Sequence, residues 1–241
     1  MAVSCLADRL QQSISLLDLF VIPLQQKLKY KIIPFGHVFL SVYIHVMTKG
    51  EATRALILER SAPIFNTKGI AGTALSDIME ATGLSKGALY IYFENKEVLA
   101  NAVVDYNMEL LGKKVAEALN RQKTAKGKLF AFIRVFHDPM DPPVAGGCPM
   151  INFGTEADEQ SPVIKEKVNQ VVNISQQLIA DIIKQGIKDG EFNPDWDHQE
   201  FATVMFAMIE GGIMICRANG NNDKMKLISA NLKKTITAQL L

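Results

Sequence analysis

Two short helical patterns, at residues 74–81 and 86–92, lie on either side of a glycine turn. Gly83 supplies the turn, where a residue without a side chain adopts conformations that other residues avoid. Ala81 is small enough to let two helices approach closely, and Ser85 stands where the N-cap of the second helix should be. This spacing predicts a helix-turn-helix, whose apolar contacts would come from Leu75, Ile78, Leu84 and Leu89.

The second of these helices would place its first turn in the major groove of DNA. Gly87 has no side chain and Ala88 a small one, so the backbone of this helix can approach the bases. Lys86 can reach a guanine edge or a phosphate. Tyrosine hydroxyls at the same end, with a threonine and a lysine at the starts of flanking helices, are suited to phosphate contacts. We therefore predict DNA contacts from Thr73, Ser85, Lys86, Gly87, Ala88, Tyr90, Tyr92 and Lys96.

A simpler interpretation is a small three-helix packing unit without a DNA role. In that case Leu89, Tyr90 and Phe93 would all be core residues. Tyr90 can also divide its ring between the core and DNA.

The stretch Gly-Leu-Ser-Lys-Gly-Ala-Leu-Tyr-Ile-Tyr-Phe-Glu-Asn-Lys-Glu-Val-Leu, at residues 83–99, resembles the signature of the tetracycline-repressor (TetR) family. Together with Phe65, Gly69, Thr73 and Ile78, the resemblance covers about residues 51–100. It implies an all-α fold, in which an N-terminal helix-turn-helix DNA-binding domain precedes a helical ligand-binding and dimerisation domain. It also implies that Thr73, Lys86, Tyr90, Tyr92 and Lys96 occupy DNA-contacting positions.

The predicted domains are an N-terminal extension at residues 1–46, a DNA-binding domain at 47–100 and an effector-binding and dimerisation domain at 101–241. Helical periodicity begins abruptly after Met47, which indicates either that the native start is there or that the extension is a genuine extra helix packed on the body. No strand-like alternation of useful length is visible. Within the first helix, Pro63 is expected to kink or loosen the last turns, and Gly69 to end them.

The resemblance implies a homodimer formed through the last long helices. Residues 201–217 carry apolar side chains on more than one face, so this helix must be covered on two sides, and its small residues allow a neighbouring helix to approach closely. The alternative is a monomer whose own helices cover both faces. The predicted dimer interface comprises Leu178, Ile182, Met205, Met208, Gly211, Gly212 and Ile215.

An effector pocket is expected inside the body, because aromatic segments there carry a few polar side chains. The predicted lining is Phe132, Phe136, Cys148, Asn152, Phe153, Glu156 and Gln177. The Gly146-Gly147-Cys148 segment resembles a motif of one TetR subgroup in which some members sense electrophiles or oxidants. A packed, unreactive cysteine is the competing interpretation, since no Lys, Arg or His is adjacent in the sequence to lower its pKa.

The formal net charge of only +1 excludes a generally polybasic nucleic-acid binder, so any DNA contact must come from locally placed cations. Three cysteines and four histidines without ligand spacing predict neither disulfides, a metal nor another cofactor. The most apolar N-terminal region is interrupted by Pro34, Gly36 and His37, and no membrane span or signal peptide is expected. These features favour a cytoplasmic protein.

The sequence thus predicts a ligand-released homodimeric repressor whose partners are a palindromic double-stranded DNA operator and an unknown small molecule. The rival is a helical enzyme or small-molecule carrier that does not bind DNA. His137, Asp138, Asp141 and Cys148 are the candidates for an enzymatic site, and they lack any known motif spacing.

Overall fold

The computed structural model describes residues 30–35, 38–43, 48–158 and 161–241. The chain forms two compact units, Met1–Leu56 and Ile57–Leu241. The first unit contains an antiparallel hairpin of β1 (Tyr30–Phe35) and β2 (Val38–Tyr43), with Tyr30 opposite Tyr43 and Phe35 opposite Val38. The prediction of no useful strand was therefore wrong here. These strands are rich in aromatic and β-branched residues but do not alternate strictly, so a search for alternation misses them.

The alternatives for the N-terminal extension depend on residues 1–29 and 44–47, which lie outside the described residues. The first helix, α2 (Lys49–Gly72), starts with a reciprocal cap. The Thr48 hydroxyl accepts from the Glu51 amide at 3.2 Å, and the Glu51 carboxylate accepts from the Thr48 amide at 2.7 Å.

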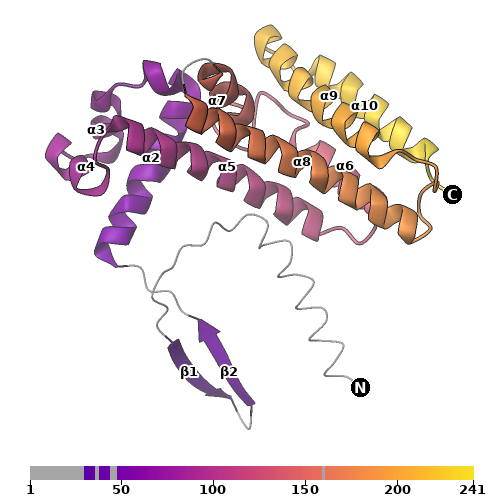
Figure 1. The fold of residues 1–241 in the computed structure, drawn as a ribbon, viewed down its shortest axis with the longest axis horizontal. Helices are drawn as coiled ribbons and strands as arrows, with labels where there is room; N and C mark the ends of the chain where they lie inside the picture. The colour runs from indigo at the N-terminus through magenta and orange to yellow at the C-terminus, as the bar shows by residue number, and fades with distance from the viewer. Residues whose placement is uncertain (1–29, 36–37, 44–47, 159–160) are drawn as a thin grey trace. The chain divides into compact units, whose positions relative to one another are not determined.

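The second unit is helical, which confirms the all-α class for the part of the chain after residue 56 (Figure 1). After α2 come α3 (Leu75–Thr82), α4 (Lys86–Tyr92), α5 (Lys96–Asn120), α6 (Ala125–Val135), α7 (Pro149–Ala157), α8 (Pro162–Lys188), α9 (His198–Asn219) and α10 (Asp223–Ala238). Helix α8 packs against α6, α7 and α9, and α9 packs in turn against α10.

Local signals explain where most of these helices start. Ser85, Asn95, Thr124 and Ser161 each accept a hydrogen bond at their side-chain oxygen from the backbone amide three residues later. The second residue of the Ser161-Pro162 pair lacks an N–H that the first turn of a helix would leave unpaired anyway.

The expected kink in α2 lies at Gly69 and not at Pro63. Gly69 has φ 76° and ψ 172°, whereas α2 keeps helical backbone angles at the exposed Pro63. The prediction for Pro63 was therefore wrong, and the prediction that Gly69 ends the regular helix is confirmed. A positive φ is accessible to glycine at little steric cost, so the break falls where the side chain is missing.

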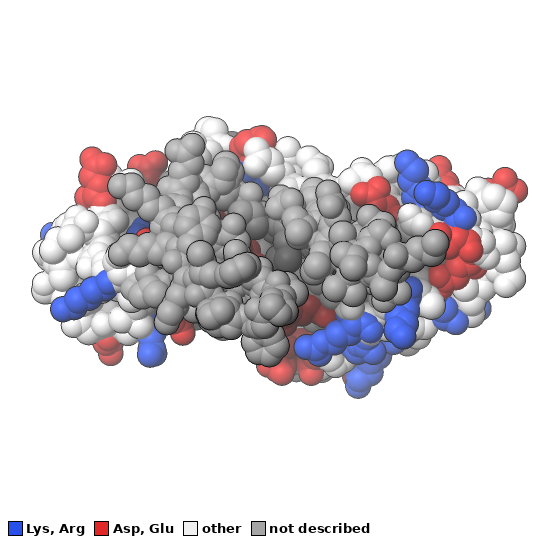
Figure 2. Space-filling view, turned by 90° about the horizontal axis from the view of Figure 1, so that it is seen from below, with Lys and Arg blue, Asp and Glu red and all other residues white. Residues whose placement is uncertain are grey.

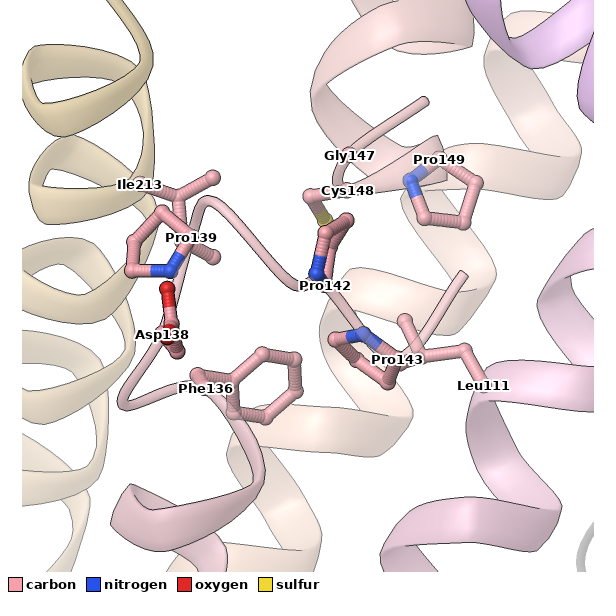
Figure 3. Close-up of a pocket in the computed structure, with 10 residues that line it drawn as sticks. All are labelled: Leu111, Phe136, Asp138, Pro139, Pro142, Pro143, Gly147, Cys148, Pro149 and Ile213. Carbon is pink, nitrogen blue, oxygen red and sulfur yellow. The ribbon is translucent and has the colours of Figure 1, made fainter. Parts of the chain in front are cut away.

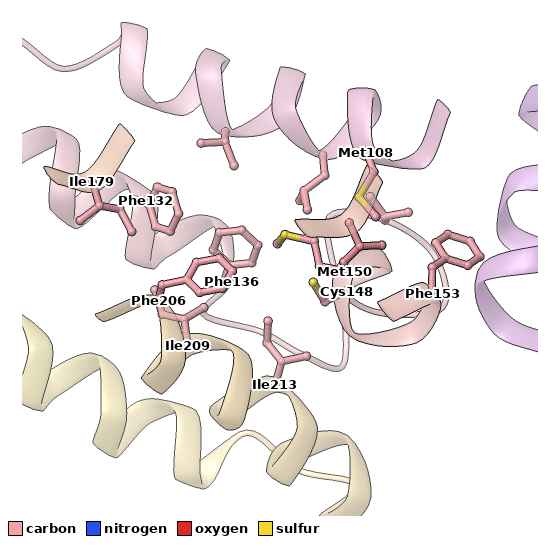
Figure 4. Close-up of a cluster of buried hydrophobic side chains, with 14 of the residues drawn as sticks. Met108, Phe132, Phe136, Cys148, Met150, Phe153, Ile179, Phe206, Ile209 and Ile213 are labelled. Carbon is pink, nitrogen blue, oxygen red and sulfur yellow. The ribbon is translucent and has the colours of Figure 1, made fainter. Parts of the chain in front are cut away.

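The core of the body is formed by side chains from α5 to α9 that point toward one another (Figure 4). Leu129, Phe153, Ile179 and Met205 are completely buried. Each such side chain contributes about 1.5–3 kcal/mol through removal of apolar surface from water. This core holds in place the loop after α6 and the start of α7, which line the candidate effector site.

Candidate DNA-binding surface and effector site

Helices α3 and α4 form the predicted helix-turn-helix. Gly83 ends α3 in the left-handed conformation, with φ 69°, and its amide donates to the Met79 carbonyl. Ile78 and Leu89 are buried between the helices, as their apolar character predicts. The Ser85 hydroxyl accepts from the Ala88 amide at 3.3 Å and thereby starts α4.

One face of α4 is open to solvent. Lys86 and Gly87 are exposed, and Tyr90 keeps 40% of its surface accessible. The Lys86 ammonium lies 5.8 Å from the centroid of the Tyr90 ring, so the two side chains share this face. A methyl group at Gly87 would meet no atom within 4 Å, which leaves the backbone there open to approach by a ligand.

The predicted DNA-contacting residues that flank this face differ in how accessible their side chains are. Tyr92 is half-buried against the core, and the half-buried Lys96 places its ammonium 3.5 Å from the Ala71 carbonyl. Thr73 is only 1% exposed, and its hydroxyl donates to the Gly69 carbonyl at 2.6 Å. The interpretation of the Thr73 side chain as a phosphate ligand is therefore not supported, because its hydrogen is committed inside the protein.

Positively and negatively charged side chains both occur on the face of the molecule shown in Figure 2. Toward one end of that face, Lys and Arg side chains lie among Asp and Glu side chains. This pattern agrees with the formal net charge of +1. Local cations such as Lys86, and not a broad basic field, would have to provide electrostatic attraction to DNA.

A small cavity of about 10 Å³ lies between the loop after α6, the start of α7 and α9 (Figure 3), with room for about one water molecule. Two residues of the predicted effector pocket, Phe136 and Cys148, line it. Phe132 and Phe153 are buried in the adjoining core (Figure 4). The other residues that line it were not in the predicted set: Leu111, Asp138, Pro139, Pro142, Pro143, Gly147, Pro149 and Ile213.

Three polar residues of the predicted pocket do not line this cavity. Gln177 is exposed and its amide donates to the Asp181 carboxylate. Asn152 donates to the Asn66 carbonyl, and Glu156 accepts from backbone amides of α2. Their partners on α2 lie 85 or 86 residues earlier in the sequence, a relation that no local pattern reveals.

Beside the cavity lies a carboxyl group on α9 that the sequence did not predict, that of Glu210. The Cys148 thiol donates to Glu210 Oε1 at 3.4 Å, and Glu210 Oε2 has no hydrogen-bond partner among the described residues. Burial raises the pKa of Glu210 to about 7. Burial also raises the pKa of the Cys148 thiol, and the neighbouring Glu210 carboxylate raises it further. The available signal was a lone glutamate inside an otherwise apolar stretch of helix.

The predicted dimer residues divide between the inside and the outside of the subunit. Ile182, Met205 and Gly212 are buried, and Leu178 and Met208 are partly buried. Ile215 is 40% exposed, and a methyl group at Gly211 would meet no atom within 4 Å. The outer surface of α9 also carries two exposed apolar residues that the predicted interface did not include, Val204 and Met214.

Helix α9 is also long and apolar enough to cross a membrane, although 44% of its most apolar window is buried inside the protein. Its packing against α8 and α10 accounts for one apolar face. The exposed apolar residues Val204, Met214 and Ile215 lie on its outer face.

Comparison with known families gives two matches. Residues 57–103 match the family described as bacterial regulatory proteins, tetR family, and residues 125–232 match the tetracyclin repressor-like C-terminal domain. The first match contains α3 and α4, and the second contains α6 to α9.

Similar proteins span most of the chain. The HTH-type transcriptional repressor ComR of Escherichia coli is 28% identical over 180 residues, which cover 73% of this chain and 85% of ComR. The HTH-type transcriptional regulator TtgR of Pseudomonas putida is 25% identical over 169 residues, 68% of this chain and 80% of TtgR.

Two solved structures resemble the chain closely. A TetR-family transcriptional regulator from Cytophaga hutchinsonii has a TM-score of 0.77 and 34% identity, covering 82% of this chain and 99% of the regulator. A TetR transcriptional regulator from Chloroflexus aurantiacus has a TM-score of 0.77 and 36% identity, covering 80% of this chain and 98% of the regulator.

Proposed function

Because the chain belongs to the TetR family of DNA-binding transcriptional regulators, we propose that it is a homodimeric repressor that leaves a palindromic operator when a small molecule binds its body. The observation that carries this proposal is the open face of α4, where Lys86, Gly87 and Tyr90 are exposed beside one another. The relatives are named as transcriptional regulators, which favours this function over the helical enzyme or carrier. The proposed compartment is the cytoplasm, where chromosomal DNA is accessible.

Each proposed DNA-contacting residue is assigned to a base, a phosphate or a backbone contact. Lys86 and Tyr90 would read base edges or hold phosphates, and Ala88 would touch a thymine methyl group. Phosphate contacts are proposed for Tyr92 and Lys96, at the end of α4 and the start of α5. Ser85 and Gly87 would contribute through the backbone at the start of α4. The Thr73 side chain is not among the proposed contacts, because its hydroxyl already donates to the Gly69 carbonyl.

The proposed dimer would place two copies of α4 in successive major grooves, about 34 Å apart along the DNA. Support comes from an apolar stripe on α9 in which Val204, Gly211 and Ile215 recur at helical spacing and lie at the surface. Gly211 would allow a helix of the second subunit to come close, because no atom of its own subunit occupies the space beside it. Met214 extends the same surface with 59% of its area exposed.

Ile215→Glu is expected to weaken the dimer at least roughly tenfold, because a carboxylate without a partner is costly to bury. Sedimentation-velocity measurements over a concentration series check the shift from dimer toward monomer. The matched control is Val163→Glu, which introduces the same charge at an exposed apolar site on α8. A dimer of unchanged affinity in Ile215→Glu, or equal weakening in both variants, would contradict the proposed interface.

We place the effector in the apolar region around the small cavity, with Phe136 and Ile213 as walls and Cys148 and Glu210 as polar groups. The effector must bind the DNA-incompetent form more tightly, since only differential affinity can shift the equilibrium. We favour reversible binding over thiol chemistry, because burial raises the pKa of Cys148 and leaves little of the reactive thiolate.

Operator binding tests the proposed function directly. Duplex fragments from the DNA upstream of the protein's own coding region are titrated with the full chain, and fluorescence anisotropy reports the complex. Specific binding is expected with Kd on the order of 10⁻⁸ M or lower at physiological salt, at least roughly a thousandfold tighter than to a shuffled duplex. Equal affinity for upstream and shuffled duplexes would contradict the proposed operator binding.

A further inference from the structure

A carboxylate on α7 holds the end of α2 through the backbone. Glu156 Oε2 accepts from the Ile70 amide at 2.7 Å, and Glu156 Oε1 accepts from the Ala71 amide at 2.6 Å. Both bonds are charge-assisted when the carboxylate is ionised, and together they fix the direction of the two amide groups. The last residues before α3 are thus bound to the body and not only to their own helix.

The approach of this carboxylate depends on the break at Gly69. A Cβ atom at position 69 would lie 2.8 Å from Glu156 Oε2, closer than real contacts allow. The backbone of Gly69 also has φ 76°, in the left-handed region. The glycine therefore both turns the chain so that the amides point toward α7 and leaves space for the carboxylate.

Two asparagines make a second connection between the same elements. Asn66 is 2% exposed, and its Nδ2 donates to the carbonyls of Ala145 at 2.8 Å and Gly147 at 3.0 Å. In the opposite direction, Asn152 Nδ2 donates to the Asn66 carbonyl at 2.8 Å. We refer to Asn66, Asn152 and Glu156, with the backbone groups they bind, as the α2–α7 clamp.

The clamp lies between the candidate effector site and the DNA-binding helices. Helix α7 follows directly on Cys148, which lines the cavity and donates to Glu210. On the other side, residues 69–74 lead into α3, and the Lys96 ammonium at the start of α5 reaches the Ala71 carbonyl. A shift of α7 would therefore change the position of the segment from which α3 and α4 begin.

We propose that Glu156, supported by Asn152 and Asn66, is a positioning residue that holds the helix-turn-helix in its DNA-binding orientation on the body. The role of the clamp in DNA binding rests on the family function, and its role in transmitting an effector signal rests on the function proposed above. Pre-organisation raises affinity because less orientational freedom is lost when DNA binds. Loosening the clamp therefore weakens DNA binding without removing any group that touches DNA.

The test uses Glu156→Gln and Glu156→Ala in the full chain. Glutamine keeps the size of the side chain, but its Nε2 faces an amide donor, so one of the two hydrogen bonds is lost. Thr155→Ala is the matched control, because Thr155 is an exposed neighbour on α7 whose hydroxyl donates to the Ile151 carbonyl in the same helix. All variants are compared with the wild type for thermal unfolding, operator affinity and backbone hydrogen exchange.

Hydrogen exchange is the readout that a general loss of stability would not reproduce. Ala71 is exposed and lines a cleft of about 490 Å³, so release of its amide from Glu156 is expected to make the amide accessible to solvent. Exchange in residues 66–73 is expected to accelerate roughly tenfold in Glu156→Gln, while exchange in the middle of α5 stays as in the wild type. Operator affinity is expected to fall roughly tenfold, the equivalent of about 1.4 kcal/mol. Glu156→Ala should show both effects more strongly.

Acceleration spread evenly over the protein, or none at residues 66–73, overturns the proposal, as does unchanged or increased operator affinity. If the wild type binds no upstream duplex specifically, the operator proposal fails. Exchange at residues 66–73, which is measured without DNA, then decides by itself whether Glu156 holds this segment.

Discussion

Lys86→Ala and Tyr90→Ala are each expected to weaken operator binding by about ten- to a hundredfold, with the dimer left intact. Both side chains project from the exposed face of α4, with the Lys86 ammonium 5.8 Å from the Tyr90 ring. Loss of a lysine that contacts a phosphate should also reduce the slope of log affinity against log salt by about one. Fluorescence anisotropy at several salt concentrations measures both quantities.

The controls separate DNA contact from packing. Lys123→Ala removes an equivalent exposed cation between α5 and α6, away from α4, and should leave specific affinity nearly unchanged. Tyr90→Phe keeps the ring, so it isolates the contribution of the hydroxyl. Wild-type affinity in both alanine variants would show that α4 is not the recognition helix.

Glu210→Gln is expected to stabilise the protein at about pH 8, by about 3 kcal/mol relative to the wild type. Burial raises the pKa of Glu210 to about 7, from an ordinary value of 4.5. The folded state therefore holds the proton more tightly than the unfolded chain. Wild-type stability falls as pH rises from the ordinary value toward 7 and then levels off, whereas glutamine has no proton to lose.

Urea unfolding of both proteins at intervals between about pH 5 and pH 8 measures this difference. The advantage of Glu210→Gln should be small at the acidic end and should grow by about 2–3 kcal/mol toward pH 8. Glu117→Gln, at an exposed site on α5, controls for the general effect of removing a carboxylate. A difference between Glu210→Gln and the wild type that does not vary with pH would contradict the buried carboxyl group.

Local chemistry explains which parts of the fold could be predicted from the sequence. Residues 86–92 were predicted as a helix and form α4 at these bounds, because a serine cap and a glycine turn define its start within three residues. Ser161 and Pro162 likewise specify the first turn of α8 through local chemistry. Such signals depend only on neighbouring residues, so no tertiary information is needed to interpret them.

Contacts between distant residues account for what the sequence did not reveal. Asn152 and Glu156 were assigned to the effector pocket because they are among the few polar side chains in aromatic segments of the body. Instead, Glu156 accepts from amides of α2, and Asn152 donates to the carbonyls of Asn66 on α2 and of Gly146. Only the packing of α7 against the remainder of the body brings these groups together. Likewise, periodicity showed two apolar faces on α9 but could not show that Met205 lies inside and Ile215 outside.

Glu156 binds backbone amides and not side chains, and this affects which amino-acid substitutions the protein can accept near α3. The two amides it binds belong to Ile70 and Ala71, and any residue except proline could supply the same N–H group. Side chains at these positions can therefore vary with the surface of α3 and α4 while the connection to the body persists. A substitution at Gly69 would be strained, because residues with a side chain rarely adopt its φ of 76° and a Cβ atom there would crowd the carboxylate of Glu156. Sequence drift that changes operator preference can thus proceed around one fixed position.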